Sequence, residues 1–333
     1  MQRYIKPVLT KTTQGTERKV GFELEFSGLE VNETCRLIAS VFSGKTSVES
    51  NFEAHVETNE FGAFGVELDW HFGKKLAKTR GLKTESIGTT DGQDALIQTL
   101  TSLVGQIVPI EIVCPPIPLS QLDRLDPLIE QLRQAGAKGT DESPVYAFGV
   151  HINTEVPDSS PLCISRYLQA YCLAQEWLVK THKVDLTRRL TPYVDLYPDE
   201  YLHTVLAYDD SIDLKTLIDD YLSSNCTRNR ALDMLPLFRH LDEKRVDNAM
   251  EDDLTNGRPT FHYRLPNCEI NKDGWQLNDS WNIWCVIEYL AAHENLLNTL
   301  IAAWQEHDAN VLFPGQPPWH EDLNQLLVNL ESG

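Results

Sequence analysis

Apolar and polar residues alternate in several short segments of the first half of the chain. Residues 20–26 read VGFELEF, and this period of two is typical of a strand with one buried and one solvated face. A run that reaches Pro115 and Pro116 ends there, because proline cannot donate a hydrogen bond to a neighbouring strand. Together these patterns predict strands at residues 20–26, 48–58, 63–72, 106–114 and 146–154, with a hairpin turn at 59–62.

Other segments repeat apolar residues at helical spacing, above all in the second half of the chain. Helices are predicted at residues 32–42, 93–104, 119–135, 161–184, 279–305 and 321–330, with shorter helical pieces before Leu241. One further strand, at residues 260–265, returns late. We expect a single domain over residues 1–333, strand-rich at 20–155 and helix-rich at 156–333. This order indicates an α+β fold in which helices back an antiparallel sheet.

The charge balance of the chain is strongly acidic. Lys and Arg number 29, and Asp and Glu number 49, which gives a formal net charge of −20 at pH 7. Such a charge repels phosphate backbones and anionic lipids, so we expect neither nucleic acid nor a membrane surface as a partner. It attracts cations instead.

Targeting and redox signals are weak. The apolar runs are far shorter than the roughly 20 residues that cross a bilayer. Residues 1–13 contain no apolar h-region, so we expect a cytoplasmic protein. The seven cysteines are scattered and form no CxxC pair, which favours reduced thiols over a disulfide framework or a zinc site.

Carboxylates and imidazoles recur on the polar faces of the predicted strands. Glu23 and Glu25 are two residues apart, so both project from one face of their strand. For a single strand, a solvated face is the simpler explanation. The pattern recurs, however, on four more segments, which carry Glu67, Asp69 and His71; Glu111; His151 and Asn153; and His262 and Arg264.

Glu111 is the most informative of these residues. It stands among apolar neighbours in residues 109–113, where an isolated carboxylate is costly unless a cation, hydrogen bonds or an arginine compensates it. Hard cations such as Mg²⁺ take carboxylate oxygens, water and phosphate oxygens as ligands. A sheet face with rows of acids can hold more than one such ion, and nucleotide phosphates would complete the ligand shells.

Four segments, in this order, resemble the signatures of the amidoligases. They are GFELEF at 21–26, EIVCPPI at 111–117, FGVHIN at 148–153 and FHYRLPN at 261–267, together with a strand that ends in Asp69. This family belongs to the carboxylate–amine ligase superfamily with glutamate–cysteine ligase and glutamine synthetase. The resemblance implies a curved antiparallel sheet with helices on its outer face, ATP and Mg²⁺ on its concave face, and ATP-dependent joining of a carboxylate to an amine.

The resemblance also implies roles for single residues. Glu23, Glu25, Glu111 and His151 fall on metal-binding positions, Asp69 on an acidic active-site position and Arg264 on the position that faces the phosphates. Where the family strand often has glutamate two residues before its arginine, this chain has His262. Imidazole can ligate a metal, although it lowers the negative charge of the site and leaves the number of metals open.

The chemistry of amide formation fits these residue types. A carboxylate is a poor electrophile, so ATP would first convert it to an acyl phosphate while cations neutralise the phosphate oxygens. Arg264, with Arg188 or Arg189 as weaker candidates, would stabilise charge on the transferred group. Asp69 or Glu67 would accept the proton of the incoming amine, and we favour Asp69.

One basic cluster interrupts the acidic chain, at Lys74, Lys75, Lys78, Arg80 and Lys83. It would close over phosphates as a lid, although a solvated loop is the simpler explanation.

Two other functions stay open, namely a metal-dependent amide hydrolase that needs no ATP and a non-catalytic nucleotide-binding relative. The sequence identifies neither the small-molecule or peptide substrates nor the oligomeric state.

Overall fold

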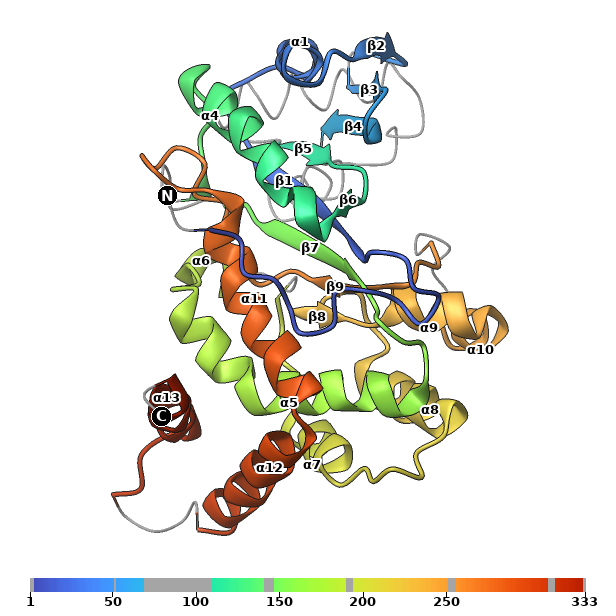
Figure 1. The fold of residues 1–333 in the computed structure, drawn as a ribbon, viewed down its shortest axis with the longest axis vertical. Coiled ribbons are helices and arrows are strands. Elements are labelled where there is room, and N and C mark those ends of the chain that lie inside the picture. The colour runs from blue at the N-terminus through green and yellow to red at the C-terminus, as the bar shows by residue number, and fades with distance from the viewer. Residues whose placement is uncertain are drawn as a thin grey trace, which may run out of the picture.

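The computed structural model describes residues 3–50, 52–68, 109–140, 147–189, 194–250, 256–310 and 315–331 (Figure 1). The strands are β1 (Lys19–Phe26), β2 (Lys45–Val48), β3 (Glu53–Thr58), β4 (Gly62–Leu68), β5 (Ile110–Val113), β6 (Ile117–Pro118), β7 (Val150–Glu155), β8 (Leu232–Asp233) and β9 (Thr260–Tyr263).

The helices are α1 (Val31–Phe42), the 3₁₀ helix η1 (Leu119–Leu125), α4 (Asp126–Gln134), α5 (Pro161–Thr181), α6 (Leu186–Arg189), α7 (Asp199–Leu206), α8 (Leu214–Asn225), α9 (Leu235–Leu241), α10 (Glu243–Ala249), α11 (Leu277–Ala292), α12 (Glu294–Ala309) and α13 (Trp319–Glu331). The fold is α+β, as the sequence pattern predicts. None of the described helices has the length and apolar character needed to cross a membrane.

The named strands form one antiparallel sheet that does not close on itself. Its order is β2-β3-β4-β5-β1-β7-β9-β8, with the short β6 paired to β1. In Figure 1 the sheet runs from β2 at the top to β8 below β9. β1 therefore lies between β5 and β7, which come much later in the sequence, and the late strand β9 joins the sheet beside β7.

Alternation along the strands gives the sheet an apolar face and a polar face. In β1, Phe22, Leu24 and Phe26 are fully buried on one side, whereas Glu23 and Glu25 occupy the other. Helix α1 packs on the β3–β4 hairpin, and α5 packs along α11. The helices thus cover the apolar side, and the polar side carries the predicted site residues.

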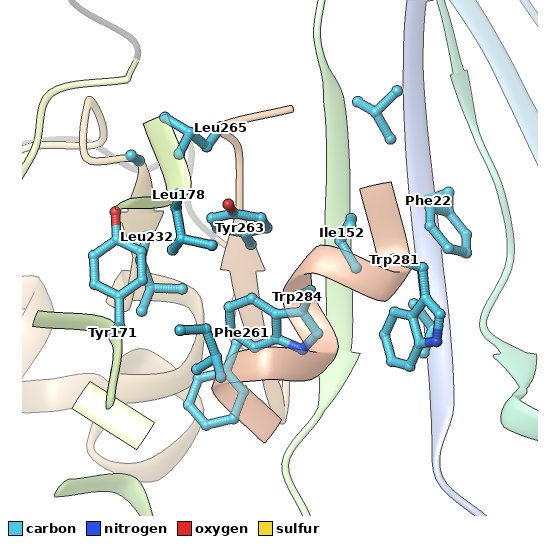
Figure 2. Close-up of a cluster of buried hydrophobic side chains, with 14 of the residues drawn as sticks. Phe22, Ile152, Tyr171, Leu178, Leu232, Phe261, Tyr263, Leu265, Trp281 and Trp284 are labelled. Carbon is cyan, nitrogen blue, oxygen red and sulfur yellow. The ribbon is translucent and has the colours of Figure 1, made fainter. Parts of the chain in front are cut away.

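An aromatic cluster fixes the strand that bears His262 to two helices (Figure 2). Phe261 and Tyr263 of β9 have ring centroids 6.0 and 4.9 Å from that of Trp284 in α11. Tyr167 of α5 stacks on Phe261 at 4.6 Å. Aromatic pairs at such separations stabilise beyond the area they bury, so α5 and α11 hold β9 in place.

A buried ion pair lies near this cluster. Arg18 donates to both carboxylate oxygens of Glu288 at 2.8 and 2.9 Å, and both side chains are fully buried. Tyr167 and Trp284 also donate to Glu288, and Arg18 donates to Thr154. Each charge is therefore both paired and hydrogen-bonded, which is the condition under which burial of an ion pair is tolerated.

Three elements differ from the sequence prediction. The strand predicted at 48–58 is confirmed at 53–58 as β3, but it does not continue to Val48, which ends β2; between the two strands the N–H groups of Glu49 and Ser50 donate to the carbonyl of Glu53. The helix predicted at 119–135 begins as the 3₁₀ helix η1. The segment predicted as helical over 279–305 is split into α11 and α12 at His293, whose φ of −116° and ψ of 81° are not helical.

Candidate metal and active site

Three carboxylates form a row across neighbouring strands on the polar face. Glu67 of β4 lies opposite Glu111 of β5, and Glu111 lies opposite Glu25 of β1. Residues directly opposite each other on one face are close neighbours, so like charges there are unfavourable unless a positive charge compensates them. Glu25 and Glu111 are also half-buried. The strand register therefore concentrates negative charge where a cation would be stabilised.

A second group of polar residues lies two residues along β1. Glu23 is opposite His151 of β7, and its Oε2 is 2.7 Å from Nδ1 of His151. Asn153 donates to Oε1 of Glu23 at 2.9 Å, and Nη1 of Arg258 lies 3.5 Å from the same oxygen. Burial alone would raise the pKa of Glu23, but the neighbouring imidazoles and the Arg258 guanidinium hold it well below its usual range. Glu23 is therefore a buried carboxylate that stays ionised.

His262 joins this group from the returning strand β9. It lies opposite Asn153 of β7 and Asp233 of β8. Its Nε2 is 3.6 Å from Oε2 of Glu23, and its ring centroid is 5.3 Å from that of His151. Within the described residues neither ring nitrogen has a hydrogen-bond partner. Burial, opposed by the charge of Glu23, lowers the pKa of His262 well below its ordinary value, so the imidazole is neutral and available as a ligand.

These side chains form two groups with the spacing of metal ligands. Glu25, Glu111 and His151 make the first ligand group, and Glu23, His151 and His262 make the second, with ligand atoms within 4.8 Å of one another in each. All five residues that the sequence predicts as metal ligands thus meet on one sheet face. His151 belongs to both groups, because its Nδ1 faces Glu23 while its Nε2 lies 3.7 Å from Oε1 of Glu25.

The donor atoms of these groups are carboxylate oxygens and imidazole nitrogens, which fit a divalent cation. The first ligand group offers two carboxylates and one imidazole, and the second offers one carboxylate and two imidazoles. Among the described residues the buried nitrogens of His262 have no hydrogen-bond partner, which fits a ligand that supplies this interaction.

The predicted phosphate-binding arginines lie in different settings. Arg264 directly follows β9, and its Nη1 donates to the carbonyl of Arg228 at 2.6 Å. Arg189 is exposed at the end of α6. Its neighbour Arg188 is buried and holds the segment after β9 through the carbonyl oxygens of Arg264, Leu265 and Pro266.

The side chain of Arg188 leaves no room for a side chain at position 149, which is a glycine. A Cβ at residue 149 would overlap with Nη2 of Arg188 and lie 3.4 Å from Oε2 of Glu25. The N–H of Gly149 donates to that same carboxylate oxygen at 2.6 Å. Burial lowers the pKa of Arg188 to about 10, and the charge of Glu25 opposes this shift. The Arg188 guanidinium therefore stays charged at neutral pH, close to the first ligand group.

Two of the predicted residues, Asp69 and Lys75, lie outside the described residues. Glu67, the other predicted base, is half-buried in the carboxylate row. Its position opposite Glu111 brings it to the edge of the first ligand group.

A family model described as "putative amidoligase enzyme" matches residues 16–286, which is well over half of the chain. The chain belongs to the amidoligase family. The matched range contains both ligand groups and Arg264, and the family supports an amide-bond-forming ligase. No curated protein and no solved structure matches the chain.

Arg258 and Asp233 of this amidoligase were not expected from its sequence. Arg258 precedes β9 in a segment with no alternation, and Asp233 belongs to a strand of two residues. The only sequence feature that links Arg258 to the site is its position four residues before His262. This position does not predict that the Arg258 side chain contacts Glu23. That contact depends on the tertiary path of the chain.

Proposed function

We propose that this amidoligase is an ATP- and Mg²⁺-dependent carboxylate–amine ligase built on a glutamine synthetase-like sheet. The supporting observation is the pair of ligand groups that meet at His151 on the polar sheet face. In the proposed reaction ATP phosphorylates a carboxylate, and an amine then displaces the phosphate to form an amide. Family membership and the gathering of acids and imidazoles on one face both favour this function.

We assign the Mg²⁺ ion to the first ligand group. Glu23 already accepts hydrogen bonds from three neighbouring side chains, so its carboxylate has little capacity left for a cation. When Nδ1 of His151 donates to Glu23, Nε2 presents its lone pair toward Glu25. A carboxylate that orients a ligating histidine in this way is a common outer partner in metal sites. Glu23 is then a positioning residue for His151.

The second ligand group suits a different ion. Two imidazoles and one carboxylate are softer donors than the oxygen set that Mg²⁺ prefers. Such a set is typical of Fe²⁺ or Zn²⁺. We therefore propose that His262 binds metal when Zn²⁺ is supplied and does not with Mg²⁺ alone.

The remaining roles follow from charge development in the reaction. Bound Mg²⁺ would neutralise charge on the phosphate oxygens of ATP. Arg264 would contact the transferred phosphoryl group. The guanidinium group of Arg188 would hold Arg264 in place by donating to the backbone carbonyl oxygen of Arg264. Asp69 or Glu67 would accept the proton of the amine. Further contacts with the phosphates are proposed for Arg189 and Lys75.

The substrates are proposed to be a small-molecule or peptide carboxylate and an amine, because the family joins these groups. The proposed location is the cytoplasm. All seven cysteines are free, as expected in a reducing compartment, and ATP is available there.

The test is release of phosphate from ATP by the purified protein with Mg²⁺, candidate carboxylates and candidate amines. A ligase releases phosphate in a manner that depends on both organic substrates. Glu111→Gln removes a carboxylate of the first ligand group and should abolish this release. Glu57→Gln changes an exposed glutamate of β3 by the same chemistry and should leave it unchanged.

Two other outcomes would replace the proposal. Cleavage of an amide without ATP would identify a metal-dependent hydrolase. Thermal stabilisation by MgATP with no turnover of any substrate pair would identify a non-catalytic nucleotide-binding relative.

A further inference from the structure

Three arginines converge at the β8–β9 end of the polar face. The backbone N–H groups of Arg258 and Arg264 donate to backbone carbonyl oxygens of the segment 231–236, which contains β8. Nη1 of Arg264 donates in turn to the carbonyl of Arg228. The buried Asp233 lies in this segment, and its carboxylate is acted on by the charges of all three arginines.

The three arginines outnumber the two carboxylates that face them, Asp233 and Glu23, although the chain as a whole carries a net charge of −20. One oxygen of Asp233 accepts the backbone N–H of Leu235. A single carboxylate, that of Asp233, compensates the three guanidinium groups only in part. Arg258 also contacts Glu23 at 3.5 Å and is 40% exposed.

Two of these arginines have donor atoms that lack acceptors among the described residues. In the part of the chain that the structure describes, the side chain of Arg228 makes no hydrogen bond or ion pair. The Nε atoms of Arg228 and Arg258 are buried and find no acceptor there. A buried donor without an acceptor is unfavourable, so this arrangement is suited to a ligand that supplies oxygen atoms.

A guanidinium group presents several donors in one plane, which match two oxygens of a carboxylate or a phosphate at once. We infer that Arg228, Arg258 and Arg264 form a binding subsite for an oxyanion group of a substrate, either a carboxylate or a phosphate. This inference rests on the proposed function and extends it, because no sequence motif assigns Arg228 or Arg258 to the site.

The subsite adjoins the ligand groups. Arg258 contacts Glu23, and Glu23 is hydrogen-bonded to His151, which belongs to both ligand groups. An anionic group bound by Arg258 therefore lies next to the side chains proposed to bind the cation. The carboxylate row of Glu67 and Glu111 lies on the opposite side of β1. The polar face is thus divided into a cation-binding part and an anion-binding part.

The test uses calorimetric titration of the whole protein with two probes. One probe is succinate, a plain dicarboxylate, and the other is a non-hydrolysable ATP analogue with Mg²⁺. Arg228→Gln and Arg258→Gln should each weaken the binding of one of these probes by about 10-fold or more, the effect of losing a charge-assisted hydrogen bond. Arg258→Lys retains the charge without the planar donors and should weaken the binding of the same probe by a smaller factor.

Arg245→Gln is the matched control, since Arg245 pairs with Asp219 and Asp242 through α10 and lies in none of the groups described above. It should bind both probes as the wild type does. Loss confined to succinate assigns the subsite to the carboxylate substrate, and loss confined to the analogue assigns it to the nucleotide phosphates. The inference is overturned if the Arg228 and Arg258 variants bind both probes normally, or if Arg245→Gln weakens them equally.

The titration also separates this inference from the proposed function. Arginine-dependent binding of a probe by a protein that never releases phosphate from ATP would uphold the subsite and remove the ligase. Substrate-dependent phosphate release that is unaffected in Arg228→Gln and Arg258→Gln would uphold the ligase and remove the subsite. Thermal unfolding of each variant checks that the chain is folded, and Arg258, which is partly exposed, is the substitution that the fold should tolerate best.

Discussion

Glu23 and His151 face each other across the β1–β7 pair, with Oε2 of the carboxylate 2.7 Å from Nδ1 of the imidazole. Both residues belong to the second ligand group, and the other ring nitrogen of His151 is directed toward Glu25 of the first ligand group. Both side chains are buried, so the ring has little freedom to turn. In the proposed metal site, this contact would orient His151 for ligation before any ion binds.

Replacing Glu23 by glutamine should weaken divalent-metal binding by about 10- to 100-fold, the range seen when the outer partner of a ligating histidine is lost. The amide retains the size of the side chain but removes the charge that favours a strongly coordinating imidazole. Titration with Mn²⁺, followed by the electron paramagnetic resonance signal of the free ion, measures the affinity. Glu57→Gln on the exposed side of β3 should bind Mn²⁺ as the wild type does. Unchanged affinity in Glu23→Gln would contradict the positioning role.

Gly149→Ala should destabilise the protein by about 1–3 kcal/mol, the usual range for overpacking. The added methyl group would overlap with the Arg188 guanidinium, which is held by three carbonyl oxygens and cannot easily move. Urea unfolding measures the change. Gly65→Ala on β4 is the control, because its Cβ would meet only Cβ of Val113 at 3.6 Å, an ordinary contact. Equal effects at the two glycines would show that the Arg188 contact is not the cause.

The sequence alone predicts which residues share a strand face, but it does not predict which strands are neighbours. The common face of Glu23 and Glu25 follows from the period of two within one strand. The pairing of Glu25 with Glu111 instead depends on the register between β1 and β5, which are far apart in the chain. Packing of the whole apolar face sets that register, and local alternation does not encode it.

The charged residues around the site show the same limit. Arg188 and Arg189 are adjacent and chemically identical, and only the path of α6 buries the first and exposes the second. The sequence pattern offered no reason to pair Arg18 with Glu288, since charged residues are usually exposed and these two are distant in the chain. Such contacts arise from tertiary packing alone.

Removing one partner of the buried pair, by Arg18→Met or Glu288→Gln, should lower the free energy of unfolding by about 3–5 kcal/mol. Each change leaves a charge or several polar groups buried without their partner. Chemical denaturation measures the loss. Arg124→Met removes one partner of an exposed pair with Glu60 and should cost less than about 1 kcal/mol. A loss for Arg18→Met that is as small as that control would contradict the structural role of the buried pair.

Acid should destabilise the protein partly through His182. Burial, followed by the charge of Arg188, lowers the pKa of His182 from 6.5 to about 3. Between these two values the unfolded chain binds a proton that the folded chain does not, so stability falls as the pH falls and is unaffected above 6.5. The contribution is about 1.4 kcal/mol per pH unit within this window.

His182→Gln removes the titrating group and should flatten this part of the pH dependence. Unfolding free energies measured at several pH values between 7 and about 4 compare the two proteins. The wild type should lose more stability than the variant over that range, by about 2 kcal/mol near pH 5. Parallel curves for the two proteins would show that His182 is not protonated on unfolding in the proposed way.

Glu25, Glu111 and His151 are proposed to hold a divalent ion at the site of ATP-dependent ligation. Anomalous diffraction from crystals soaked with Mn²⁺ and a non-hydrolysable ATP analogue tests it most directly. An anomalous peak is expected between these three side chains, at about 2.0–2.6 Å from the carboxylate oxygens, with phosphate oxygens completing the shell of the ion. Anomalous peaks that lie only elsewhere, with nucleotide bound away from the polar sheet face, would contradict it.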